Sequence, residues 1–156
     1  MSNPNDVAGQ CSGLKLTLSR IINAPCEMIF RAWAEPEQLL EWFGPEGGRC
    51  QEITADVKPG GAFRFQMISP RGERIAIGKY LEVVPNKRLQ FTWSWENYAM
   101  PNSVVTVEFE DLGGKTLLIL THTGLPDQED VEQHTHGWNA AVKKFASLME
   151  LEKVEV

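Results

Sequence analysis

The chain has 156 residues, a length that suits one domain and leaves little room for two. Its composition, with 42% hydrophobic and 23% charged residues, is typical of a globular protein and excludes a disordered or fibrous one. The net charge of −6 and the lack of clustered Lys and Arg argue against a nucleic-acid partner, because a phosphate-binding surface needs such clusters.

The cysteines and the N-terminal residues bear on the cellular compartment. Cys11, Cys26 and Cys50 are an odd number without metal-site spacing, which favours reduced thiols in a reducing compartment. No apolar run approaches the ~20 residues of a membrane span. Residues 1–13 lack the basic start and the apolar stretch of a signal peptide. We expect these residues to form a flexible N-terminal tail and the protein to be soluble and cytoplasmic.

One strand and two short helices are predicted at the start of the domain. Apolar and polar residues alternate from Leu14 to Ile22, the pattern of a half-buried strand. Pro25 suits the first turn of a helix, and apolar residues at helical spacing follow it. Pro36 can begin a second helix, which Gly44-Pro45 ends. Two short helices are therefore inserted after the first strand.

Six further strands are predicted between Cys50 and Leu125. Apolar residues alternate with polar ones in each, and turn signals such as Pro59-Gly60-Gly61 separate the strands. The segment from Leu117 to Leu120 is apolar on both faces, which predicts a more buried strand. Because the strands follow one another through short turns, we expect an antiparallel sheet.

The last predicted element is one helix from about Asp127 to Glu152. Asp127 suits the N-cap, and the acidic residues after it complement the positive end of the helix dipole. A single apolar stripe runs along the helix and consists of Trp138, Ala141, Val142, Phe145, Leu148 and Met149. Such a helix is about 39 Å long at 1.5 Å per residue, which is enough to cross a sheet about 30 Å wide.

This order of elements predicts an α+β fold. A curved antiparallel sheet of six to seven strands wraps around the long C-terminal helix, and we expect residues 14–152 to form this single domain. A strongly twisted sheet bent around one helix leaves a space that side chains or a ligand must fill. The side chains expected to face this space are Phe63, Phe65, Met67, Phe91, Trp93, Trp95 and Trp138.

These inward-facing side chains have two interpretations. They could simply pack the core of the domain. However, Trp93 and Trp95 share one face of a strand, and Trp138 lies on the facing helix. Each indole brings an N–H group that needs a partner when it is buried. This requirement favours an amphipathic pocket over a dry core.

A family resemblance extends from about Leu14 to Leu151. It is carried by Phe30-Arg31-Ala32-Trp33, Trp42-Phe43-Gly44-Pro45, Lys58-Pro59-Gly60-Gly61, Gly78-Lys79-Tyr80-Leu81-Glu82 and Thr121-His122-Thr123-Gly124-Leu125, with His134 and Gly137-Trp138 behind them. In this order the motifs resemble the activator of heat-shock-protein-90 ATPase homologue-like family. Many members have two tryptophans where this chain has Trp42-Phe43. That difference could change the shape of a pocket but not the fold.

The resemblance implies the START-like, helix-grip fold of the SRPBCC superfamily, in agreement with the pattern of elements. It also implies a ligand pocket between the sheet and the last helix, although some members act on chaperones. A role in the stress response would follow from the chaperone relatives.

Two histidines are candidates for chemistry. His122 has the strand parity of Leu118 and Leu120, so we expect it to face inward. His134 lies one turn before Trp138 on the apolar stripe, and the two histidines are expected to meet inside the mouth of the cavity. Three interpretations are open: hydrogen-bonding or packing histidines, polar anchors for a ligand head group, or a metal site or general base.

No other pattern points to catalysis, a metal or a cofactor. His134 and His136 project about 200° apart on a helix and cannot bind one ion. The sequence has no Gly-x-Ser-x-Gly nucleophile motif and no activated cysteine. Gly47-Gly48 and Gly60-Gly61 lack the helix and the lysine of a phosphate-binding loop. We predict no catalytic residue, no metal and no cofactor.

We therefore predict a protein that binds a small apolar or amphipathic molecule in a hydrophobic cavity. The predicted ligand-binding residues are Trp42, Phe63, Phe65, Met67, Phe91, Trp93, Trp95, His122, His134 and Trp138. Two alternatives remain: a partner protein that stimulates a chaperone ATPase, and a weak cyclase or hydratase that uses His122 or His134 to move a proton. A non-enzymatic function is favoured. A monomer and a homodimer through an edge strand are both open.

Overall fold

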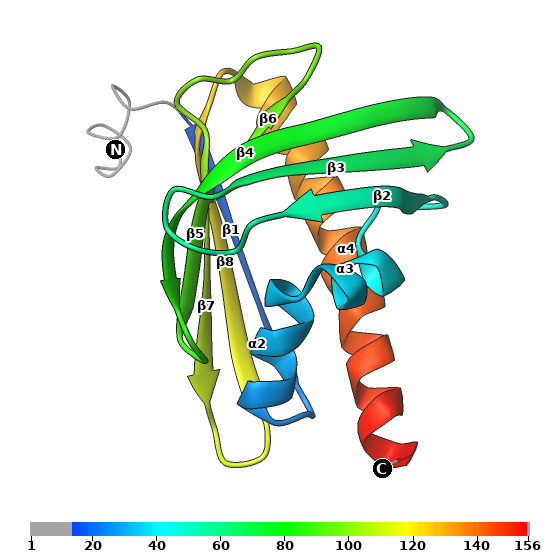
Figure 1. The fold of residues 1–156 in the computed structure, drawn as a ribbon, viewed down its shortest axis with the longest axis vertical. Helices are drawn as coiled ribbons and strands as arrows, with labels where there is room; N and C mark the ends of the chain where they lie inside the picture. Colours follow the sequence, from blue (N-terminus) through cyan, green and yellow to red (C-terminus); the bar gives the residue numbers. More distant parts are fainter. Residues whose placement is uncertain (1–13, 156) are drawn as a thin grey trace.

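The computed structural model describes residues 14–155. One strand, two short helices, seven strands and a long helix follow one another in this part of the chain (Figure 1). Their bounds are β1 Leu14–Ile22, α2 Cys26–Ala34, α3 Pro36–Trp42, β2 Arg49–Ala55, β3 Ala62–Ser69, β4 Gly72–Val84, β5 Arg88–Thr92, β6 Ser94–Trp95, β7 Val104–Asp111, β8 Thr116–Leu125 and α4 Gln128–Glu155. The predicted tail, residues 1–13, and Cys11 lie outside the described residues.

The strands form one antiparallel sheet. Seven of them lie in the order β1-β8-β7-β5-β4-β3-β2, and the short strand β6 pairs with β4 beside this path. The sheet bends along β4, because its residues 72–79 pair with β3 while its residues 80–84 pair with β5. A register shift between Tyr80 and Glu82 marks the bend. The predicted α+β class, curved sheet and long C-terminal helix are confirmed.

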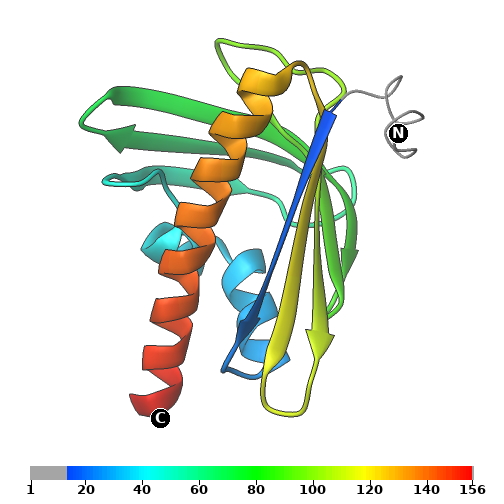
Figure 2. The same ribbon diagram turned by 180° about the vertical axis from the view of Figure 1, so that it is seen from behind.

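All three helices lie on the concave side of the sheet (Figure 1). The long helix α4 runs beside β1, and Figure 2 shows this from behind. The carboxylate of Asp127 accepts a hydrogen bond of 2.9 Å from the backbone N–H of Asp130, as the predicted N-cap should. No helix within residues 14–155 is long and apolar enough to cross a membrane.

Two strands differ from the sequence expectation. The single strand expected from Leu89 to Trp95 is divided at Trp93, whose backbone N–H donates to the carbonyl of Ser103. The division occurs because β5 pairs with the end of β4, whereas β6 pairs with its beginning. In β8, Leu118 and Leu120 are fully buried, but Leu117 and Ile119 are only half-buried, since none of the helices in residues 14–155 covers the outer face of the sheet.

Aromatic side chains fill most of the space between the sheet and the helices. Phe63 on β3 lies opposite Gly78 on β4, and its ring occupies the place where a side chain at position 78 would stand. Phe145 of α4 packs against the rings of Trp33 and Trp42. The core is therefore densely aromatic where α2 and α3 lie under the sheet. A cavity lies nearer the beginning of α4, along its residues 132–141.

Candidate functional site

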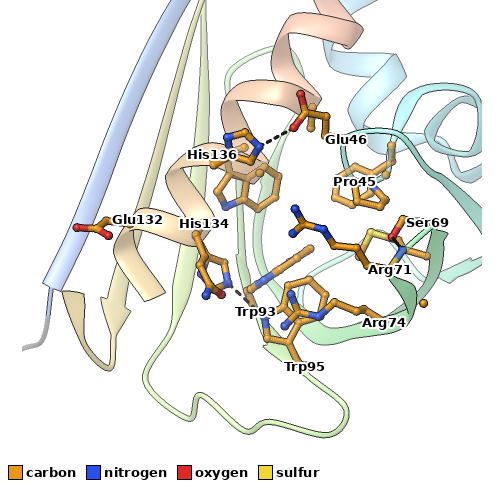
Figure 3. A pocket seen from close by; sticks show the side chains of 18 residues that line it. Pro45, Glu46, Ser69, Arg71, Arg74, Trp93, Trp95, Glu132, His134 and His136 are labelled. Atoms are coloured by element: carbon orange, nitrogen blue, oxygen red, sulfur yellow. Dashed lines mark hydrogen bonds and ion pairs between the residues drawn. The ribbon is translucent and has the colours of Figure 1, made fainter. Parts of the chain in front are cut away.

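The candidate site is a pocket with a volume of about 530 Å³. The β3–β4 hairpin, β6, α4 and the loop after α3 meet around it (Figure 3). Its lining residues are Phe43, Gly44, Pro45, Glu46, Met67, Ser69, Arg71, Gly72, Arg74, Trp93, Trp95, Glu132, Gln133, His134, His136, Gly137, Trp138 and Ala141. The volume is within the range of about 300–1,000 Å³ that small-molecule sites usually have.

Three tryptophans make up much of the inner wall of the pocket. The ring centroids of Trp93 and Trp95 lie 5.4 Å apart, and those of Trp93 and Trp138 lie 5.1 Å apart. All three side chains are buried, and Met67 and Phe43 complete the apolar surface next to them. The three indoles converge as the strand and helix patterns predicted. Such a wall suits a flat apolar molecule.

A hydrogen bond from Trp138 fixes the tautomer of His122. The indole N–H of Trp138 donates to Nδ1 of His122 at 3.0 Å. In a neutral ring the proton must then reside on Nε2, which lies 2.6 Å from Oγ of Ser103 and donates to it. His122 is fully buried, and burial lowers its pKa to about 3, with the neighbouring His134 adding to the effect. His122 is therefore neutral near pH 7.

A second indole fixes the tautomer of His134 in the opposite sense. The N–H of Trp95 donates to Nε2 of His134 at 3.2 Å, so Nδ1 carries the proton and donates to the carbonyl oxygen of Asp130 at 2.7 Å. The carboxylate of Asp130 accepts a hydrogen bond from the hydroxyl of Tyr98 at 2.7 Å. Burial lowers the pKa of His134, and the backbone bond to Asp130 opposes this shift.

The two histidines approach each other as expected, but they meet behind the pocket wall and not inside its mouth, since His122 does not line the pocket. Their ring centroids lie 5.1 Å apart with the planes nearly perpendicular. The acceptor lone pair of each ring is already occupied by an indole N–H. A general base needs a free lone pair that can reach its substrate. In this arrangement the two histidines accept hydrogen bonds from Trp95 and Trp138, whereas the buried indole N–H of Trp93 has no partner among the described residues.

Two arginines at the mouth of the pocket were not among the predicted site residues. Arg71 lies in the turn between β3 and β4, and Figure 3 shows its guanidinium extending toward α4. Arg74 lies opposite Met67 in the register of β3 and β4, so the two side chains share the inner face of the sheet. The Cζ atom of Arg74 stands 3.8 Å from the centroid of the Trp95 ring.

A signal for Arg74 was present in the sequence. Positions 74, 76, 78 and 80 alternate along β4, and Ala76 and Tyr80 are buried on its inner face. An arginine at the first of these positions interrupts an otherwise apolar or small-residue row. Arg74 is exposed as a whole, but partial burial of its guanidinium lowers its pKa, and the nearby carboxylate of Asp130 counteracts this shift. A charged residue on the core face of a strand is a reasonable indication of a site.

The remaining mouth residues come from the loop after α3 and from α4. Nε2 of His136 lies 2.6 Å from Oε1 of Glu46, and this exposed contact links the two elements across the opening. Gly137 follows His136 in α4, and a Cβ atom built on it would meet no atom within 4 Å. The wall of the pocket is therefore open at Gly137.

The predicted site residues divide into two groups. Five of them line the pocket: Met67, Trp93, Trp95, His134 and Trp138. The other five lie behind this wall in the core: Trp42, Phe63, Phe65, Phe91 and His122. Trp42 is fully buried, and its indole N–H donates to the carbonyl of Ala32 at 3.0 Å. The alternation along the strands and the apolar stripe of the helix could not separate the two groups, because residues of both groups face the space between the sheet and the helices.

Residues 14–155 contain neither a cluster of metal ligands nor an activated thiol. No group of three or more His, Cys, Asp or Glu side chains in residues 14–155 is placed to hold a metal ion. Cys26 and Cys50 are free thiols and buried. Burial raises the pKa of Cys50 to about 11, and burial together with the carboxylate of Asp111 raises that of Cys26. Both thiols are therefore protonated and weakly nucleophilic near pH 7.

Comparisons with known proteins identify relatives of this fold and sequence. The family model described as "Activator of Hsp90 ATPase homolog 1-like protein" matches residues 23–150. No curated protein matches the chain.

Several solved structures are similar over nearly their whole length. The AHSA1 protein from Silicibacter pomeroyi is 28% identical with a TM-score of 0.81, over 89% of this chain and 99% of its own. Protein CV1439 from Chromobacterium violaceum is 28% identical with a TM-score of 0.78, over 87% of this chain and 96% of its own. Protein NE0264 from Nitrosomonas europaea is 27% identical with a TM-score of 0.76, over 90% and 97% of the two chains.

The family match covers most of the chain, and the fold agrees with that of its relatives along almost their entire length. The chain therefore belongs to the family of activator of Hsp90 ATPase homolog 1-like proteins and has the START-like fold.

Proposed function

We propose that this protein binds a small apolar or amphipathic molecule in the pocket between the β3–β4 hairpin and α4. The observation that carries the proposal is the convergence of Trp93, Trp95 and Trp138 on one cavity of about 530 Å³. Pockets of this size with mainly apolar walls and few polar groups are typical small-molecule sites.

Gly137 supports the proposal from a different direction. A glycine inside a helix costs roughly 1 kcal/mol of stability relative to alanine. Steric crowding does not explain Gly137, since a Cβ atom there would meet nothing within 4 Å. Its position on the pocket wall offers an explanation, because a side chain would project into the cavity. The glycine thus lowers the stability of the helix at the position where a ligand would need space.

The hydrogen bonds of the wall also favour binding over catalysis. His122 and His134 each accept an indole N–H, and each donates its own proton to Ser103 or to the Asp130 carbonyl. Both rings would have to break these bonds before they could move a proton for a substrate. As acceptors for Trp95 and Trp138, they instead hold two of the wall indoles in place.

The test is a titration with N-phenyl-1-naphthylamine, a neutral probe whose fluorescence rises in apolar surroundings. The wild-type protein is compared with Gly137→Leu, which adds a side chain at the pocket wall without removing a core contact. The matched control is Asn139→Leu, which adds the same side chain on the exposed face of α4. We expect saturable binding to the wild type and to the control, and at least about tenfold weaker binding to Gly137→Leu.

Two results would contradict the proposal. Equal affinities for Gly137→Leu and the wild type would place the probe elsewhere on the protein. Absence of saturable binding to the wild type would mean that the cavity does not accept an apolar molecule. Thermal unfolding of all three proteins shows whether each variant is folded, and both leucines are expected to raise helix propensity at their positions.

A further inference from the structure

We propose that the ligand carries a carboxylate on an aromatic body, and that Arg71 and Arg74 bind the carboxylate at the mouth of the pocket. This inference rests on the proposed ligand-binding function. It names the chemical class of the ligand, which the apolar wall alone does not.

The register of the hairpin places Arg74 on the inner face of the sheet. Arg74 pairs with Met67, and Ala76 pairs with Phe65, so alternate residues of β4 point to the same side as these buried side chains. A long cation at such a position could turn outward to solvent. Instead, its guanidinium lies over the ring of Trp95, at 3.8 Å from the centroid. Arg74 is therefore held against the pocket wall.

Stacking leaves the hydrogen-bonding edge of Arg74 available. A guanidinium binds an aromatic ring through its flat face, while its N–H groups point outward in the plane. Arg71, three residues earlier, extends toward α4 from the hairpin turn (Figure 3). Two guanidinium groups therefore stand at one opening with their donors free for an anion.

Neither arginine forms an ion pair within residues 14–155, and the same is true of Arg20 and Arg49 on the sheet, whereas other arginines are paired. Arg64 pairs with Glu96 on the outer face of the same hairpin, and Arg88 pairs with two glutamates. A shortage of acidic residues is not the reason, since the chain has 21 Asp and Glu against 15 Lys and Arg. The charges of Arg71 and Arg74 at the pocket are therefore not neutralised by an ion pair within residues 14–155.

The carboxylates near the mouth are engaged elsewhere or point away. Glu46 is linked to His136 at 2.6 Å, and the Asp130 carboxylate accepts the hydroxyl of Tyr98 at 2.7 Å. Glu132 also lines the pocket, but Figure 3 shows its carboxylate on the far side of α4, directed away from the arginines. An anion that enters from solvent would therefore meet two guanidinium groups that form no ion pair within residues 14–155, although the carboxylate of Asp130 lies near enough to act on Arg74.

The geometry favours a planar anion on a planar body. The guanidinium carbon of Arg74 lies over the ring of Trp95, so a carboxylate bound to this guanidinium would lie beside the indole wall. An aromatic ring attached to the carboxylate can then continue along the wall past Trp93 toward Trp138. A carboxylate also meets the fork of an arginine with two parallel hydrogen bonds.

The experiment compares 1-naphthaleneacetate with its neutral isostere 1-naphthaleneacetamide by isothermal titration calorimetry. The proteins are the wild type, Arg71→Gln, Arg74→Gln and the control Arg64→Gln, which removes the same charge from the outer face of the hairpin. We expect the wild type to bind the acid about tenfold more tightly than the amide, given the strength of charged hydrogen bonds. Each pocket variant should lose most of this preference, and Arg64→Gln should retain it.

The outcomes separate this inference from the proposed function. If acid and amide bind the wild type equally, or if Arg71→Gln and Arg74→Gln keep the preference, the anion site is wrong while the apolar pocket stands. If neither compound nor N-phenyl-1-naphthylamine binds, both proposals fail. A naphthalenesulfonate that binds more tightly than the acetate would overturn the carboxylate assignment.

Discussion

The indole N–H of Trp138 donates to Nδ1 of His122 over a distance of 3.0 Å. This bond joins the long helix to β8 through two buried side chains. It also prevents His122 from acting as a base, because Nδ1, the ring nitrogen that could accept a proton, already accepts this hydrogen bond. A feature that resembles a catalytic residue in the sequence is thus a structural acceptor in the folded protein.

The first prediction concerns the protonation of His122. Its pKa is lowered to about 3, so the ring should remain neutral, with the proton on Nε2, from pH 8 down to about pH 4. Long-range ¹H–¹⁵N correlation spectra of the histidine rings report both the tautomer and the charge. The ring signals of His136, which is exposed, are recorded in the same spectra for comparison with those of the buried His122. A His122 ring that becomes charged near pH 6.5 would contradict this account.

The second prediction concerns the stability of the protein as a function of pH. The pKa of His122 is about 3 in the folded state and about 6.5 in the unfolded chain, so the unfolded chain binds more protons between these values. The free energy of unfolding should therefore fall as the pH falls from about 6.5 toward 3, by at most about 1.4 kcal/mol per pH unit for this group.

The matched variant for this effect is His122→Gln. Glutamine does not titrate, and its amide can still donate to Ser103. Urea unfolding at several pH values should show a smaller pH dependence for the variant than for the wild type. Equal slopes of unfolding free energy against pH would show that His122 takes up its proton without opposing folding.

The third prediction concerns the pair formed by Trp95 and His134. His134→Leu removes the acceptor of a buried indole N–H and should destabilise the protein by about 1–3 kcal/mol beyond the effect of packing. In Trp95→Phe the donor is absent as well, so the same His134→Leu change should cost less. A double-mutant cycle in urea measures this coupling. Additive effects of the two substitutions would mean that the hydrogen bond contributes nothing measurable.

The fourth prediction contrasts two glycines. A Cβ atom at Gly78 would lie 2.5 Å from Cζ of Phe63 and would also clash with the backbone carbonyl of Thr92. Gly78→Ala should therefore destabilise the protein by about 3 kcal/mol. Gly137→Ala meets no atom within 4 Å and should stabilise it by roughly 1 kcal/mol. Chemical denaturation of both variants checks the opposite signs, and a stable Gly78→Ala variant would refute the packing shown for Phe63.

Much of the fold could be predicted from the sequence because its signals are local. Alternation gave β1 from Leu14 to Ile22, and the apolar stripe gave α4 with its cap at Asp127. The division of the strand at Trp93 could not be predicted, because it depends on which half of β4 each neighbouring strand pairs with. That pairing is a tertiary property that no local pattern contains.

The site was predictable only in part for the same reason. The pattern indicated that Trp95 and Trp138 face inward, and they do. It did not show that Trp42 lies in the core with its N–H bound to a backbone carbonyl, while Trp95 lies on the cavity. Arg74 was missed because it precedes the apolar residues that mark this strand in the sequence, and its place beside the pocket depends on the register opposite Met67.

The most direct test of a ligand pocket uses the five tryptophans as reporters. Indole ¹H–¹⁵N signals are recorded during a titration with 1-naphthol, a soluble neutral aromatic molecule. If the account is correct, the signals of Trp93, Trp95 and Trp138 shift saturably, and that of Trp42, held by the Ala32 carbonyl in the core, shifts much less. Shifts of all five signals to the same extent, or no saturable shift of the three wall signals, would contradict binding in this pocket.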